Sequence, residues 1–578
     1  MQEQIALSKQ IGKEIAQYLT EVVDVTGSYS FSQYKLTNRI SLFETQTYPT
    51  GKFDKQGNYK YWFDIISPRI DSEVKNIDFD TKNIEAYSPL KIDEVPSIIT
   101  NLRLTEYLRE TGQAEEINSA IEEGSGWGNV VWKKVKDGYE RVDLLNFYVI
   151  NQTARTIKET PTIERHQLTS TDLRAKADVW EYVEESLTEC ATNTYKTSVG
   201  TQEQDTTVPY YDVYERNGEI SVADLKEAKG EKVGEGDEDR YTLAKVIGIG
   251  KKGNSSGVTI KYILFAEEID EMPFKEYHRS RYKQRWFREG IYELLFDLQV
   301  RANQIGNQLA QGLELASKTV LRSNDKLIVQ NIMTDIRNGD IIKSSDLTQV
   351  NLRMDSFDQL VADWNRVIAL ANDLTNSREV VQGITPASGT PLGTTQLLNQ
   401  NAGKLFDFIR EKLAIPFSQM FEQWIVPELI KDMRSQDVLR LTGDSDMLAR
   451  LNKIVVDNWY LQNLPLLPPH TPEIAETLKQ EKLDELKARP QLLMKATKEL
   501  FKGFTPKVSV IITGEQVNLQ ADLQTLSGFI ALEQDPIRRS AMIEMAMRKS
   551  GIDAGSLPKT EVQPVQQPAP VLASETAV

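Results

Sequence analysis

The residues that could cradle a phosphate or attack an ester lie in glycine-rich segments, and each segment has the wrong local order. Gly124, Gly126 and Gly128 follow an expected helix and precede an expected strand, whereas a dinucleotide fingerprint places its glycines before a helix. Residues 248–253 lack the Gly-x-x-x-x-Gly-Lys-Ser/Thr spacing of a phosphate-binding loop. Ser255 lies in a Gly-x-Ser-x-Gly match, but a strand is expected after it, not the helix of a nucleophile elbow. We therefore expect turns here, no cofactor and no enzymatic activity.

Residue types that ligate metals or act as nucleophiles are scarce. The single cysteine, Cys190, excludes an intramolecular disulfide and a cysteine metal cluster, and the three histidines lie far apart in the sequence. Asp78, Asp80 and Glu85 are more simply a solvated acidic surface than a catalytic group. A metal-dependent nuclease stays open on the sequence alone, but no pattern singles it out. We expect neither catalytic residues nor a metal site.

One short segment is unusually basic. Its cations alternate with Tyr277, Tyr282, Trp286 and Phe287, a pattern that can contact nucleic-acid phosphates. The whole chain, however, carries 68 basic and 84 acidic residues, a net charge of −16. We therefore favour pairing with acidic neighbours across a subunit interface over phosphate binding. The cluster comprises Lys275, Arg279, Arg281, Lys283, Arg285 and Arg288.

Length and hydropathy limit the class of protein. A chain of 578 residues predicts several packed subregions. No apolar run of 18 residues exists, so we expect no membrane span. Glu3, Lys9 and Lys13 interrupt the first apolar positions, which predicts that no signal peptide is present.

The first 275 residues have the patterns of mixed helices and hairpins. Apolar spacing predicts the helices, and alternation around Gly- and Asn-containing turns predicts the hairpins. The expected helices are 3–23, 96–123 and 169–185, and the expected hairpins are 129–149, 210–221 around an Asn217-Gly218 turn, and 241–265.

The pattern changes at Ile291. An apolar stripe from Ile291 to Ala316 keeps heptad spacing and predicts a helix roughly 40 Å long, with neutral amides on the opposite face. Short β-type runs follow in 319–352, and a second stripe covers 357–374. A Gly/Pro-rich loop then precedes a third stripe, which Pro416 and Pro427 should bend or interrupt.

This order of elements resembles the portal (head–tail connector) proteins of tailed bacteriophages, particularly those of podovirus type. The resemblance covers roughly residues 100–435 and rests on the order of the segments, since no single short motif is diagnostic. The segments that carry it are Val142–Asn151, Pro161–Arg165, Met272-Pro-Phe274 with its basic neighbours, Glu289–Leu295 opening the amide-bearing helix, the Gly/Pro loop, and Thr394–Leu398 through Ile415-Pro-Phe417 to Trp424.

The resemblance implies an α+β, mainly helical portal fold. Its expected parts are an N-terminal wing (1–275), a first stem helix (276–318), a β clip (319–352), a second stem helix (353–382), a tunnel loop (383–394), a long kinked wing helix (395–434), wing closure with a helical crown (435–555) and a disordered tail (556–578). The residues expected to matter are the stem residues Gln299, Asn303, Asn307 and Trp364, the clip residues Asn324, Lys326, Asn331, Arg337, Asn338 and Asp340, and the tunnel-loop residues Gly383, Thr385, Pro386, Ser388, Gly389, Pro391 and Gly393.

The resemblance also implies a function. The chain would form a ring, usually of twelve subunits, at a capsid vertex of a virion assembled in the host cytoplasm. Double-stranded DNA would be packaged and ejected through the ring, with the amide face bordering water or DNA. The other implied partners are the terminase large subunit, a head–tail adaptor, and major capsid or scaffolding protein, with no membrane contact. The alternatives are another virion connector, a packaging enzyme and a cellular helical scaffold.

Overall fold

The computed structural model of the chain describes most of the N-terminal 320 residues and several helices beyond them. The described residues are 6–24, 30–55, 57–77, 84–87, 94–136, 138–190, 193–194, 198–199, 202–203, 209–252, 258–317, 320–322, 348–350, 357–376, 392–432, short pieces between 452 and 463, 472–488, 507–510, and short pieces between 526 and 546. Among these residues 56% are helical and 21% are in strands, so the fold is mixed α+β as expected. The chain divides into two units, Met1–Ile511 and Ile512–Val578, and described elements with assigned bounds lie in the first.

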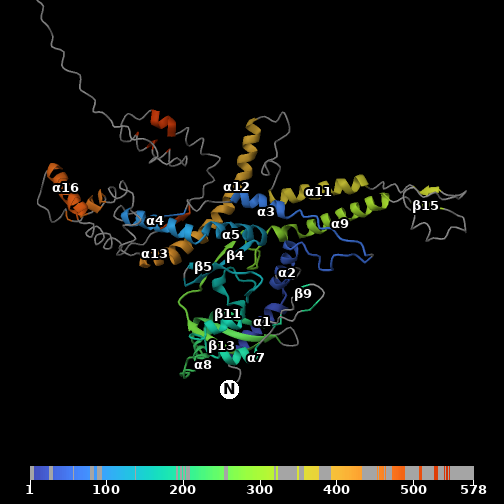
Figure 1. The fold of residues 1–578 in the computed structure, drawn as a ribbon, viewed down its shortest axis with the longest axis horizontal. Helices are drawn as coiled ribbons and strands as arrows, with labels where there is room; N and C mark the ends of the chain where they lie inside the picture. Colours follow the sequence, from blue (N-terminus) through green and yellow to red (C-terminus); the bar gives the residue numbers. More distant parts are fainter. Residues whose placement is uncertain are drawn as a thin grey trace, which may run out of the picture. The chain divides into compact units, whose positions relative to one another are not determined.

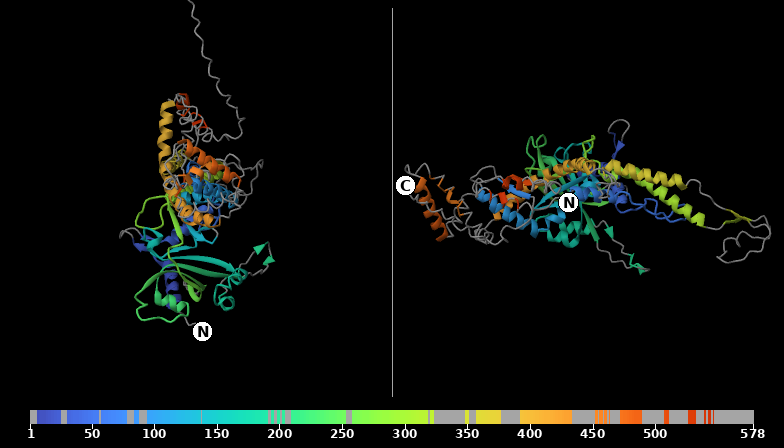
Figure 2. Two further views of the ribbon diagram at one scale, coloured as in Figure 1. Left: turned by 90° about the vertical axis from the view of Figure 1, so that its left-hand side faces the viewer. Right: turned by 90° about the horizontal axis from the view of Figure 1, so that it is seen from above.

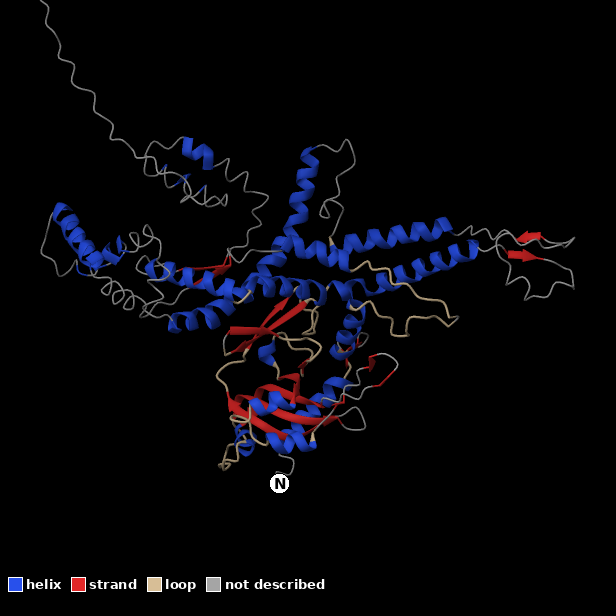
Figure 3. Cartoon of the chain, in the orientation of Figure 1, coloured by secondary structure: helices blue, strands red, loops and turns tan. Residues whose placement is uncertain are grey.

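A six-stranded antiparallel sheet dominates the early part of the first unit (Figures 1 and 3). Its order is β13-β12-β11-β7-β6, with β8 also paired to β11. The strands are β6 (Phe147–Val149), β7 (Thr162–Thr169), β8 (Asn193–Thr194), β11 (Pro209–Ser221), β12 (Tyr241–Lys252) and β13 (Val258–Glu268). The pairing of β12 with β13 confirms the hairpin expected over 241–265.

Helices cover both faces of this sheet, because its strands alternate apolar residues on the two sides. On one face Ile11 of α1 (Ala6–Thr20) packs among Tyr214 and Val246, together with α8 (Val222–Ala228). On the other, Leu173 of α6 (Ser170–Ala175) and α7 (Val183–Glu189) pack against Ile247. Adjacent residues Val246 and Ile247 therefore serve opposite cores.

The prediction of a turn at Asn217-Gly218 is wrong. Strand β11 runs straight through it, with Asn217 opposite both Thr162 and Lys245. Pairing along both edges of β11 outweighs the local turn preference of Asn-Gly. Gly218 is required for a different reason: it adopts φ +150° against Pro161, where an added Cβ would lie 2.7 Å from the proline Cα.

A three-stranded sheet and four small pairs make up the rest of the described strands. The hairpin β4 (Asn129–Val135)–β5 (Gly138–Arg141) confirms the start of the hairpin expected over 129–149, but β6 belongs to the large sheet and not to this hairpin. Strand β14 (Phe274–His278) pairs with the outer edge of β4. The small pairs are β1 (Val23–Asp24) with β2 (Ser30–Phe31), β3 (Ile84–Tyr87) with β17 (Lys507–Val510), β9 (Ser198–Val199) with β10 (Gln202–Glu203), and β15 (Val320–Arg322) with β16 (Thr348–Val350).

The helix expected over 96–123 is two helices, α4 (Glu94–Glu110) and α5 (Gln113–Trp127), separated at Gly112, which adopts a left-handed conformation. Gly124 and Gly126 do not stop α5, contrary to expectation; the left-handed Gly128 ends it. An added Cβ at Gly124 or Gly126 would lie 2.8 Å from a tyrosine ring, so both glycines make room for aromatic packing.

A core that contains Trp127, Trp286 and Phe296 is shared by four further helices. They are α2 (Gln33–Glu44), α3 (Ser67–Ile77), α9 (Ile291–Ser317) and α11 (Phe357–Thr375). The later described helices are α12 (Leu392–Met420), α13 (Val426–Asp432) and α16 (Pro472–Ala488). Helix α12 continues through Pro416, and a π turn over Phe421–Ile425 joins it to α13. The π turn widens the helix just before Pro427, whose ring would otherwise meet the carbonyl four residues earlier.

Candidate functional site

Helices α9 and α11 form a hairpin, and a pair of short strands lies at its end. The helices lie side by side in Figure 1 and in the right-hand view of Figure 2, with β15 beyond them. Arg301 of α9 donates from Nε (3.0 Å) and Nη2 (2.6 Å) to Asp363 Oδ2 of α11. Strand β15 pairs antiparallel with β16, with Val320 opposite Val350, so the chain reverses direction there.

Three amides on α9 form a ladder with an extended segment of the same chain. Asn307 Oδ1 accepts from the backbone N–H of Tyr61 (2.8 Å), Asn303 Oδ1 from that of Phe63 (2.8 Å), and Gln299 Oε1 from that of Ile65 (2.9 Å). Gln299 Nε2 also donates to the Phe63 carbonyl (2.7 Å), and Asn307 Nδ2 to the Tyr61 carbonyl (2.9 Å). The amide side chains thus replace the partner strand that residues 61–65 would otherwise need.

The ladder works because two repeats nearly coincide. Four residues of an α-helix advance about 6.0 Å along its axis, and two residues of extended chain advance about 6.6 Å. Amides at every fourth helical position can therefore meet every second residue of a strand. We expected this amide face to border water or DNA, and that expectation is wrong for the amides in the ladder, since their polar groups bind the chain's own backbone.

The fourth expected stem residue, Trp364, meets the same segment. Its ring lies edge-on to Phe63, with the centroids 5.8 Å apart. Phe63 also fills the space beside Gly306, where an added Cβ would lie 2.4 Å from the ring. The four stem residues thus converge on residues 61–65, a partner that the sequence reasoning missed. The spacing of the amides at every fourth position was the available signal.

The basic cluster pairs mainly within its own chain. Arg279 donates twice to the fully buried Glu73 (2.6 and 2.7 Å), and Arg285 twice to Glu293 (2.9 and 2.8 Å). These ion pairs brace the approach to α9. Of the other members, Lys283 pairs with Glu289, Lys275 binds the Gln423 side chain and lies over the Trp424 ring, Arg288 donates to backbone carbonyls, and Arg281 is exposed.

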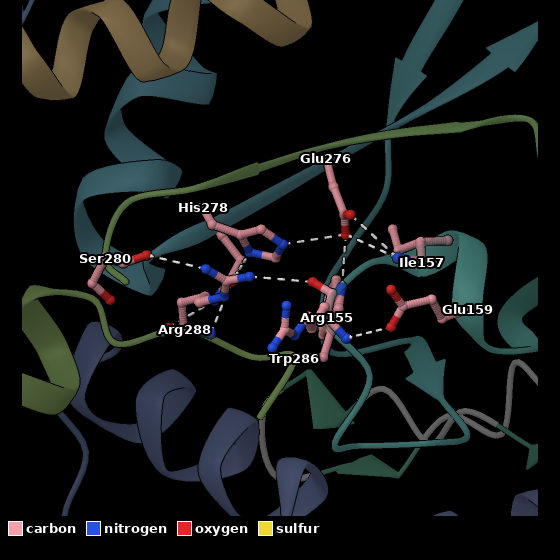
Figure 4. A network of polar contacts seen from close by, with 9 residues as sticks. Arg155, Ile157, Glu159, Glu276, His278, Ser280, Trp286 and Arg288 are labelled. Carbon is pink, nitrogen blue, oxygen red and sulfur yellow. Dashed lines mark hydrogen bonds and ion pairs between the residues drawn. The ribbon is translucent and has the colours of Figure 1, made fainter. Parts of the chain in front are cut away.

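A largely buried polar network around Glu276 and His278 also holds this segment (Figure 4). Glu276 accepts from the Trp286 indole (2.7 Å) and from the backbone N–H of Ile157, and lies 3.2 Å from His278 Nε2. His278 Nδ1 contacts Asn129 Oδ1 (2.8 Å). Burial lowers the pKa of His278 despite the nearby Glu276. A neutral ring therefore joins β4 and β14 to the chain leading into α9, which is a structural arrangement.

Two of the predicted sites lie mostly outside the described residues. These are the clip residues Asn324, Lys326, Asn331, Arg337, Asn338 and Asp340, and the tunnel-loop residues Gly383, Thr385, Pro386, Ser388, Gly389 and Pro391. Gly393 is described, and it lies in the first turn of α12, two residues before the expected start of that helix.

One group in the described part of the chain has metal-ligating residue types close together: Glu164, His166 and Glu215. The group is already bridged by a cation of the protein, because Lys133 Nζ lies 2.7 Å from Glu164 and 2.8 Å from Glu215. Glu164 and Glu215 face each other on adjacent strands, where like charges repel. A buried lysine between them is the simpler account of this group than a metal.

No family model matches the sequence, and no curated protein matches it. Among the described helices, none has the length and apolar character needed to cross a membrane.

Proposed function

We propose that the chain is the subunit of a portal ring, a structural component through which double-stranded DNA enters and leaves a capsid. The observation that carries the proposal is the braced hairpin, α9 and α11 with a strand pair at the end. The long helix α12 follows in the chain, and a π turn joins it to α13. The order of these elements supports the assignment of a stem, a clip and a long wing helix, the parts that the resemblance implies.

The bracing suits a stem that bears load. The ladder and the Arg301–Asp363 pair fix α9 against residues 61–65 and against α11. Because the amide groups of the ladder are hydrogen-bonded, they do not become unpaired polar groups when they are buried. They also hold α9 in one register against residues 61–65. A stem held in this way would keep its position while DNA moves past it.

Exposed apolar side chains along the hairpin support contact between subunits. Val300 and Leu313 of α9, and Val361, Leu370 and Leu374 of α11, are between 41% and 59% exposed in the single chain. Single exposed apolar residues are ordinary, but several on two adjacent helices favour a covering partner. In a ring each subunit would present one side of its hairpin to the next, a contact that closes by rotation.

The charge distribution suits passage of DNA more than capture. The cluster that could have gripped phosphates has Arg279 and Arg285 bound to carboxylates of the same chain, and the net charge is −16. An acidic ring would repel the DNA backbone and let it slide. The proposed partners remain those of the resemblance: terminase at the clip, then a head–tail adaptor, with capsid or scaffolding protein around the ring.

Mass photometry of a double variant, Leu370→Glu with Leu374→Glu, tests the subunit contact. Carboxylates in a packed interface should shift the purified chain from rings to monomers. The matched control is Val233→Glu, because Val233 is as exposed as Leu374 (48% each) but lies off the hairpin. If the double variant and the control both form the same assemblies as the unaltered chain, the hairpin does not form the contact between subunits. If the unaltered chain is itself monomeric, the portal proposal fails.

A further inference from the structure

A cavity of about 620 Å³ lies between the β4–β5 hairpin and the large sheet. Its walls come from Lys133, Lys134 and Lys136 of the hairpin, from His166, Glu215 and Lys245 of the sheet, and from Lys176 and Trp180 after α6. The volume is in the range of cavities that hold small ligands. The cavity belongs to no part of the proposed stem.

The walls are strongly basic. Five lysines and one histidine line the cavity against two glutamates, Glu140 and Glu215. Counting Glu164, which binds Lys133 from beside the lining, the lysines still exceed the carboxylates by two. The net charge of the protein is −16, so a cluster of lysines is unexpected. Repulsion between like charges raises the free energy of such a cluster unless nearby anions offset it.

Ion pairs within the fold account for the charged residues deep in the cavity, but not for the lysines at its rim. Lys133, Lys245 and His166 neutralise the cross-strand pair Glu164–Glu215, through contacts of 2.7 to 3.8 Å. Lys134, Lys136 and Lys176 at the rim are exposed, and none has an ion pair in the described part of the chain.

The inner group also supplies positive charge at neutral pH. Burial alone would lower the pKa of His166, but its hydrogen bonds to Glu164 and Glu215 outweigh that effect and raise the pKa to about 9. The imidazole is therefore a cation under physiological conditions, and its ring lies in the cavity wall. Lys176 also lies over the Trp180 ring, 4.6 Å from its centroid, which fixes this lysine at the rim.

We propose that this cavity binds a small ligand with clustered phosphate groups, of the size of a nucleoside triphosphate, with Lys134, Lys136 and Lys176 as its principal contacts. Lysine binds phosphate as a mobile point charge and does not need the planar geometry of a carboxylate partner. Several phosphoryl groups on one ligand would match several separated lysines. The ligand could be a free polyphosphate or the end of a nucleic-acid chain, and these two sources share the same chemistry.

Isothermal titration calorimetry of the full chain, with inorganic triphosphate, ATP or a short duplex DNA at low salt, tests the proposal. We expect saturable binding of triphosphate or ATP, weakened at least tenfold in the double variant Lys134→Gln with Lys176→Gln. The matched control is Lys229→Gln with Lys232→Gln, two exposed lysines outside the cavity. Binding of duplex DNA with the same lysine dependence, and with no binding of the small probes, would assign the site to the end of a nucleic acid.

Three outcomes would overturn the proposal: no binding of any phosphate probe, equal weakening by the control pair, or equally tight binding of hexaglutamate. Circular dichroism and the melting temperature of each variant check that these exposed substitutions leave the fold intact. The cavity lies outside the stem, so the two proposals can fail separately. If the chain forms rings that bind no phosphate probe, only the ligand proposal is refuted. If the chain is monomeric and binds phosphate, only the portal proposal is refuted.

Discussion

Removal of one amide from the ladder should loosen the segment that it holds. Asn303 is 5% exposed, and its Oδ1 accepts from the backbone N–H of Phe63 and from Gln299 Nε2. In Asn303→Ala the Phe63 N–H loses its acceptor inside the fold. Leaving a buried donor unpaired costs about 1–3 kcal/mol. Alanine regains about 0.5 kcal/mol through its higher helix propensity, so the net loss lies between about 0.5 and 2.5 kcal/mol and centres on about 1–2 kcal/mol.

Hydrogen exchange followed by mass spectrometry measures this loss where it occurs. A loss of one to two kcal/mol corresponds to a factor of about 5–30 in an equilibrium constant. Peptides that contain residues 61–65 should therefore exchange about 5–30 times faster, while peptides from the large sheet should not change. The matched control is Gln304→Ala, one residue along the same helix, where the side chain is exposed. Equal exchange of residues 61–65 in the two variants would refute the ladder as the element that holds this segment.

Three further outcomes follow from the described contacts. Gly306→Ala places a methyl group 2.4 Å from the Phe63 ring and should lower the free energy of unfolding by about 1–3 kcal/mol, measured by denaturant titration. Glu73→Gln leaves the buried Arg279 without its carboxylate and should cost about 3–5 kcal/mol in the same assay. The pKa of His166 is raised to about 9 in the folded chain from 6.5, so its stabilisation is complete below pH 6.5 and is lost as the pH rises through 9. His166→Gln should remove about 3 kcal/mol of that pH dependence, since one pKa unit corresponds to about 1.4 kcal/mol.

Each of these variants has a comparison that isolates its cause. Gly528→Ala adds a methyl group to another helical glycine with open space around it and should leave stability unchanged or slightly raised. Glu289→Gln breaks a more exposed pair with Lys283 and should cost less than about 1 kcal/mol. For His166, the same change in stability between pH 6.5 and pH 9 with and without the imidazole would contradict the assigned protonation. A cost for Glu73→Gln no larger than that for Glu289→Gln would contradict the buried charge pair.

Long periodic segments were predictable because their pattern is local. The stripe from Ile291 to Ala316 predicted α9, which spans Ile291–Ser317, and the alternation over 241–265 predicted β12 and β13. Such segments need no knowledge of distant residues to reveal their period.

Errors arose where distant contacts override local preference. Asn217-Gly218 has the composition of a turn, but strands from both sides hold it extended. Gly124 and Gly126 have the composition of a helix end, but tyrosine rings from elsewhere in the chain fill the space beside them. The residues that decide these outcomes lie 26 or more positions away along the chain, so no short local window contains the information.

The candidate site shows the same division. The amide spacing on α9 was visible, but its partner, residues 61–65, lies more than 230 residues earlier and has no pattern that marks it. The basic cluster was visible too, and the prediction that it pairs with acids fits Arg279 and Arg285, but their partners lie in the same chain and not across an interface.

The most direct test of the central claim is electron microscopy of the purified full-length chain in negative stain. The portal proposal predicts closed rings with a central hole, of twelve subunits in class averages, and with the hairpins arranged around the axis. The rings should disappear in the Leu370→Glu, Leu374→Glu variant and persist in Val233→Glu. All three proteins are imaged at one concentration at which each is soluble. Monomers or open filaments of the unaltered protein would contradict the claim.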